Sequence, residues 1–97
     1  MAQATTTKVN ELFTTAKTLD KKVVNLANGV KITAELKGMK REVAEAEALI
    51  NSIKATAQEY RRIYLWSGKY KEEIEVMDFE AVIKEYNAEI KALACRI

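Results

Sequence analysis

Apolar and small residues recur along this chain at alternating spacings of three and four residues, in three separate segments. The first series is Val9, Leu12, Ala16, Leu19, Val23, Leu26 and Val30. The second is Met39, Val43, Ala46, Ile50, Ile53, Ala57, Tyr60 and Tyr64, and the third is Val76, Phe79, Ile83, Tyr86, Ile90, Leu93 and Ile97. A repeat of 3.5 residues keeps one apolar seam along one side of an α-helix. We therefore predict three helices, at roughly 8–36, 39–66 and 76–95.

Glycine and capping residues mark the predicted helix ends. Gly38 lies between the first two segments, where it can take the left-handed conformation that ends a helix. Ser67-Gly68 is expected to close the second helix, and Asp78 is the expected N-cap of the third. The first two segments are nearly equal in length, which suits an antiparallel hairpin. The prediction is a single all-α domain over residues 1–97, a helical hairpin plus a third helix in a three-helix coiled-coil-like bundle.

Two other architectures fit parts of the same pattern. Asn28-Gly29 is a strong β-hairpin turn, and apolar and polar residues alternate after it, so an α+β fold with a small antiparallel hairpin at 22–36 is the main alternative. The helical interpretation is favoured because the heptad continues through Gly29 without a phase slip. In the other variant the first two segments fuse into one long helix, and the rod-like molecule must oligomerise.

The seam of the first segment suits packing against a helix of another chain or against a helix of the same chain. Valine or alanine occupies one seam position and leucine mostly occupies the other. β-Branched residues at one seam position with leucine at the other favour two-stranded parallel pairing. The series can equally face the core of an intramolecular bundle, and the two arrangements can coexist.

Composition argues against the common catalytic chemistries. The chain has no histidine and one cysteine, which excludes a disulfide scaffold, the usual Cys/His zinc site and a His-dependent triad. Cys95 has no histidine to activate it, and the three glycines are isolated, so no phosphate-binding loop exists. The glutamates at 42, 45 and 47 are expected on a solvated helix face. The sequence thus predicts a protein that is not an enzyme, with no catalytic, cofactor-binding or metal-binding residues and no cofactor.

Charge is unevenly placed although the net charge is only +2. From Arg61 to Lys71 there are four basic residues and no acidic one, and from Glu72 to Glu80 there are five acidic residues and no basic one. Such a junction of opposite charges suits head-to-tail or antiparallel self-association better than a polyanionic partner.

The candidate partner-binding residues lie in the same region, where aromatic and basic side chains are interleaved. They are Tyr60, Arg61, Arg62, Tyr64, Trp66, Lys69 and Tyr70. Tyr, Trp and Arg are enriched in the residues that dominate protein interfaces, and the same types can bind single-stranded nucleic acid. The purely structural interpretation is that these side chains pack the end of the bundle. We expect an assembly, adaptor or scaffolding protein that acts through coiled-coil-like helix association. Its partner is expected to be another protein or a second copy of the chain, and we expect a homo-oligomer. A nucleic-acid-binding helical module is an alternative that the small net charge disfavours.

Trp66-Ser67-Gly68 forms a Trp-x-Gly motif, and a short helical chain with this motif resembles the WXG family of small secreted helical hairpins. The resemblance covers three residues. It implies that the motif marks the central hairpin turn, but here it lies about two-thirds along the chain. The family's C-terminal Tyr-x-x-x-Asp/Glu is not matched at Tyr86, whose fourth follower is Ile90.

No membrane or export signal is apparent in the sequence. The first residues lack a basic stretch followed by an apolar one, so no ordinary signal peptide is predicted. No apolar run approaches the ~20 residues of a spanning helix. We expect a cytoplasmic protein with no membrane association, with export by a leaderless route kept as an alternative.

Overall fold

The computed structural model describes the backbone of residues 2–97 and the side chains from Lys8 onward. Its elements are α1 (Ala2–Thr18), the π-helical turn η1 (Leu19–Val23), α2 (Val24–Leu36), α3 (Lys40–Leu65), α4 (Lys71–Glu75) and α5 (Phe79–Cys95). The described residues contain no strand and form an all-α helical bundle, as predicted. The α+β alternative is therefore wrong.

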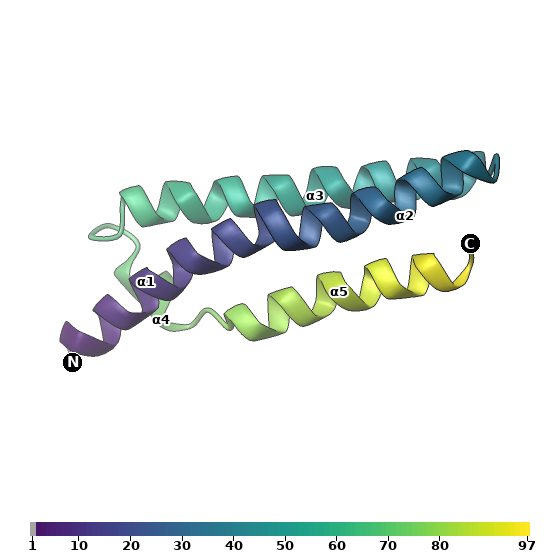
Figure 1. The fold of residues 1–97 in the computed structure, drawn as a ribbon. Coiled ribbons are helices and arrows are strands. Elements are labelled where there is room, and N and C mark those ends of the chain that lie inside the picture. Colours follow the sequence, from purple (N-terminus) through teal and green to yellow (C-terminus); the bar gives the residue numbers. More distant parts are fainter. Residues whose placement is uncertain (1) are drawn as a thin grey trace.

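The first long arm of the bundle is continuous through α1, η1 and α2, and α3 returns antiparallel to it (Figure 1). The reversal occurs at Lys37–Met39, where Gly38 has a φ of +69°. The amide of Met39 donates to the carbonyl of Ala34 across this turn, at 2.9 Å. The hairpin is thus confirmed, and the fused rod is wrong. Because α5 lies along the hairpin, the molecule is elongated, at 52 × 19 × 16 Å.

Residues 22–36 are helical because the tertiary contacts of the arm outweigh the local turn preference of Asn28-Gly29. Ala27, directly before that dipeptide, and Ala34, further along α2, are at most 1% exposed. Thr33 Oγ1 donates to the carbonyl of Gly29 at 3.0 Å, a bond made along a helix. A β-hairpin would remove both alanines from the helix interface.

The π-helical turn shifts the predicted seam of the first arm. Leu19 and Val23 are buried as the heptad requires, but the next core residues are Val24 and Ala27. A π-turn adds one residue to the helix, and each residue of a helix turns by about 100°. The prediction that Leu26 lies in the seam is therefore wrong, and this side chain is 54% exposed.

Alanine lines the interface between the two arms of the hairpin. Five alanines of the two arms are at most 1% exposed: Ala16, Ala27, Ala34, Ala46 and Ala57. Small side chains allow two helices to pack closely, and larger residues such as Leu12, Leu19 and Ile53 fill the space between them and the other elements. The second predicted seam is confirmed from Ala46 to Tyr60, where every seam residue is buried.

The third predicted helix is shorter than expected at its start. It begins at Phe79 rather than at residue 76, and Val76 is 83% exposed outside it. Asp78 is its N-cap, as predicted, since its Oδ1 accepts from the amide of Ala81 at 3.1 Å. The sequence did not predict α4, whose Ile74 is fully buried. Periodicity could not reveal α4, because five residues hold little more than one turn.

Two groups of polar contacts join α5 to the hairpin. At its middle, the hydroxyls of Tyr86 and Thr56 are 2.6 Å apart. Near its end, Arg96 pairs with Glu45, and Lys37 Nζ donates to the carbonyl of Ile97 at 2.7 Å. These contacts fix α5 at two levels of the hairpin.

Candidate functional site

The predicted partner-binding segment begins in the core. Tyr60 is 9% exposed, and its ring meets the ring of Phe79 edge-on, with centroids 5.8 Å apart and an angle of 84°. Burial raises the pKa of the Tyr60 phenol above its ordinary value, and the nearby Tyr86 raises it further. Tyr60 therefore packs within the core, where it joins α3 to α5.

The two arginines of the segment are exposed but already engaged within the chain. Arg61 pairs with Asp20 of the π-helical turn. Arg62 donates to both carboxylate oxygens of Glu59 at 2.6 Å, and this bond raises the pKa of the guanidinium. Both pairs lie at the surface, where an ion pair contributes little to stability. Their effect on the segment is to neutralise half of its four positive charges.

Tyr64 covers the outer edge of the core together with α1. Its ring centroid lies 5.1 Å from that of Phe13, which is 41% exposed. Lys17 Nζ is 5.3 Å from the centroid of the Phe13 ring. The hairpin thus adds Phe13 and Lys17 to the segment, which the sequence could not place there because they lie about 50 residues upstream.

Leu65 and Trp66 are the exposed apolar residues at the end of α3. Leu65 is 78% exposed and Trp66 is 61% exposed, although both are large and apolar. The amide of Trp66 still bonds to carbonyls of the last helical turn, so this residue is held by the backbone of α3. The sequence singled out Trp66 but not Leu65, which occupies no seam position in the heptad.

A tight turn carries the chain from Trp66 to α4. The carbonyl of Trp66 accepts from the amides of Lys69, at 2.8 Å, and Tyr70, at 3.2 Å. Tyr70 is half-buried against the core, and Lys69 Nζ lies 5.7 Å from the centroid of the Tyr70 ring. We call the exposed or partly exposed group formed by Tyr64, Leu65, Trp66, Lys69 and Tyr70 the Trp66 surface.

Opposite charges directly follow the Trp66 surface in the sequence. Lys71, Glu72 and Glu73 form the start of α4, and all three are exposed. None of these three makes an ion pair within the part of the chain that the structure describes. Residues one and two apart on a helix point in different directions, so these charges cannot pair with one another.

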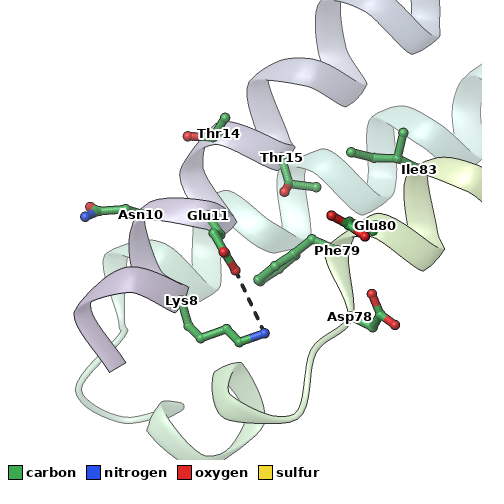
Figure 2. A pocket seen from close by; sticks show the side chains of 9 residues that line it. All are labelled: Lys8, Asn10, Glu11, Thr14, Thr15, Asp78, Phe79, Glu80 and Ile83. Carbon is green, nitrogen blue, oxygen red and sulfur yellow. Dashed lines mark ion pairs between the residues drawn. The ribbon is translucent and has the colours of Figure 1, made fainter. Parts of the chain in front are cut away.

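A cleft of about 530 Å³ lies between α1 and the start of α5. Figure 2 shows the side chains that line it. Lys8, Glu11 and Asp78 of its lining are engaged within the chain. Lys8 Nζ lies 3.8 Å from Glu11, donates to the carbonyl of Met77 at 3.2 Å, and sits 5.6 Å from the centroid of the Phe79 ring. These contacts anchor the loop between α4 and α5. They also mean that Lys8 already has partners within the chain.

A second, more apolar groove of about 480 Å³ lies between α2 and the end of α5. It is lined by Leu26, Gly29, Val30, Thr33, Lys37, Ala94 and Ile97. One of its apolar side chains, Leu26, lies outside the core because the seam shifts at the π-helical turn.

The described residues contain no cluster of three or more His, Cys, Asp or Glu side chains that could hold a metal ion. Cys95 is exposed and unpaired. Within the same residues, no helix is both long enough and apolar enough to cross a membrane.

The Trp-x-Gly motif does not form the central turn of the long hairpin. That turn lies at Lys37–Met39, and Trp66-Ser67-Gly68 lies at the opposite end of α3, before the short α4. Comparison with family models, curated proteins and solved structures finds no match to this chain.

Proposed function

We propose that this chain is a non-enzymatic assembly, adaptor or scaffolding protein whose partner-binding region is the Trp66 surface. The observation that supports the proposal is a pair of successive residues, Leu65 and Trp66, whose side chains are 78% and 61% exposed at the end of a well-packed bundle. Water contact with large apolar groups is unfavourable, and burying them against a partner removes it.

The surroundings of this pair resemble the composition of a protein interface. Partly buried aromatic rings, Tyr64 and Tyr70, flank it, and a lysine lies at its edge. Interfaces combine a few aromatic anchors with a polar rim, and truncation of a central tryptophan can cost about 2 kcal/mol or more. A nucleic-acid partner is the weaker candidate, because Arg61 and Arg62 pair with Asp20 and Glu59.

Site-specific photocrosslinking in cells that express the chain tests the proposal without assuming the partner. p-Benzoylphenylalanine replaces Leu65 in one variant and Ala88, on the exposed face of α5, in a matched control. We expect protein adducts from position 65 at least about tenfold above those from position 88, because only the former adjoins the proposed anchor.

Adding Trp66→Ala to the position-65 variant should reduce the adducts at least about tenfold, as expected for the loss of a central aromatic anchor. Circular dichroism should remain unchanged, because Trp66 lies beyond the last residue of α3 and is mostly exposed. Equal labelling at positions 65 and 88, or labelling that does not depend on Trp66, would refute the proposal.

A further inference from the structure

We infer that the partner of the Trp66 surface is a second copy of this chain, held in a two-fold symmetric dimer in which the basic end of each copy faces the acidic start of α4 in the other. The inference rests on the proposed function and names its partner. The observation behind it is the order of unpaired charges beside the exposed apolar pair.

The charges follow one another without mixing. Lys69 and Lys71 lie on one side of a boundary, and Glu72 and Glu73 lie directly on the other. In the described part of the chain, Lys69 Nζ lies over the Tyr70 ring, and Lys71, Glu72 and Glu73 have no ion-pair partner. Each copy therefore carries two cations and two anions in close succession along the sequence, and none of the four forms an ion pair with another described residue.

Two-fold symmetry pairs such a surface with itself. In a symmetric dimer, if residue i of one copy contacts residue j of the other, then j also contacts i. When the axis passes near the boundary between Lys71 and Glu72, the lysines of each copy face the glutamates of the other. A surface whose charges all have the same sign is not self-complementary, because two-fold symmetry would bring like charges together.

The apolar side chains lie where such a dimer would bury them. Leu65 and Trp66 precede the charged boundary by a single tight turn, and the carbonyl of Trp66 bonds to the amides of Lys69 and Tyr70. Val76, which is 83% exposed, lies just beyond the other end of α4. Three of the most exposed apolar side chains therefore lie on either side of the charges along the sequence, and a dimer formed there would remove them from water.

The test uses two charge-reversed variants of the full chain. One is Lys69→Glu with Lys71→Glu, and the other is Glu72→Lys with Glu73→Lys. Each alone should self-associate at least about tenfold more weakly than the wild type in sedimentation equilibrium, because like charges now face each other. Mixed together, the two variants should form a one-to-one dimer, which native mass spectrometry distinguishes from either homodimer.

Matched controls carry the same changes in charge on the outer face of α5. They are Lys84→Glu with Lys91→Glu, and Glu85→Lys with Glu89→Lys, all at exposed positions. We expect both controls to dimerise like the wild type, and circular dichroism should show that all four variants remain helical.

The inference is overturned if the wild type stays monomeric in sedimentation equilibrium, or if the two reversed variants do not recover association when mixed. The proposed function has a separate outcome. Adducts from position 65 to a different protein, with a monomeric wild type, overturn the dimer and leave the assembly role standing. An absence of adducts from position 65 rejects the assembly role itself.

Discussion

Two glycines of this chain occupy opposite kinds of backbone position. Gly38 has a φ of +69° at the hairpin turn, in the left-handed region that costs other residues about 1–2 kcal/mol. Gly29 lies inside α2, where glycine is about 0.5–1 kcal/mol less favourable than alanine. A Cβ added at either position meets no atom within 4 Å, so the effect of substitution comes from the backbone alone.

Alanine substitutions at these two positions should therefore change stability in opposite directions. We expect Gly38→Ala to lower the free energy of unfolding by about 1–2 kcal/mol, and Gly29→Ala to raise it by about 0.5–1 kcal/mol. Urea denaturation followed by circular dichroism measures both. A loss of stability in Gly29→Ala would contradict a helical conformation at this residue and favour the turn that Asn28-Gly29 prefers locally.

The residues of the candidate site were only partly predictable one by one. Interleaving of aromatic and basic residues identified the segment, and Trp66 is indeed exposed within it. Tyr60 belongs to the seam of α3, so its heptad position already indicated burial, and it packs against Phe79. The partners of Arg61 and Phe13 come from the opposite arm of the hairpin, and no local pattern specifies them.

Among the elements, the π-helical turn causes the largest departure from the buried seam that the heptad repeat predicts. It adds one residue between Leu19 and Val23, and as a result α2 buries Ala27 and Ala34 against α3. If one exposed residue of this turn is removed, a regular α-helix keeps the same alanines at the interface. Removal of a residue from a regular helix has the opposite result, since it rotates everything that follows by about 100°.

Deletion of Lys22 should therefore be tolerated, whereas deletion of Lys54 should not. Both are exposed lysines, one in the π-helical turn and one inside α3. We expect the first deletion to change the free energy of unfolding by less than about 1 kcal/mol. The second should cost at least about 3 kcal/mol, because it misplaces Ala57, Tyr60 and Ile63 in the core. Thermal unfolding distinguishes the two variants, and equal destabilisation would contradict the π-helical turn.

At the scale of the whole molecule, the equal arms of the hairpin produce a long, narrow shape. The radius of gyration of the Cα atoms is 15.4 Å. A compact chain of this length would have about 12.5 Å. A narrow bundle has a large surface for its volume, so each helix packs on a thin core. Apolar residues at the ends of the bundle remain exposed.

Small-angle X-ray scattering should reveal this shape in solution. For the Trp66→Ala variant, which we expect to be monomeric, the radius of gyration should lie near 15 Å or slightly above it. The wild type at higher concentration should show a longest dimension well beyond 52 Å, because the two copies meet at one end of their long axes. A monomer close to 12.5 Å would mean that α5 and the hairpin fold into a more compact bundle.

The sequence by itself determined the features that depend on a few neighbouring residues. Repeats of three and four residues identified the three long helices, Gly38 located the reversal, and Asp78 located the start of α5. These signals are readable because helix periodicity, left-handed turns and N-caps involve interactions within about one turn of the chain.

Only the tertiary structure decided how the helices are rotated and which aromatic residues face solvent. The π-helical turn exists where the arm packs on α3, and it exposes Leu26 in place of Ala27, although the heptad itself is unbroken there. α4 is held by the burial of Ile74, and this helix leaves Glu72 and Glu73 exposed. The physical reason is that rotation and docking depend on the free energy of burial between segments far apart in the chain, whereas periodicity records only that each helix has an apolar side.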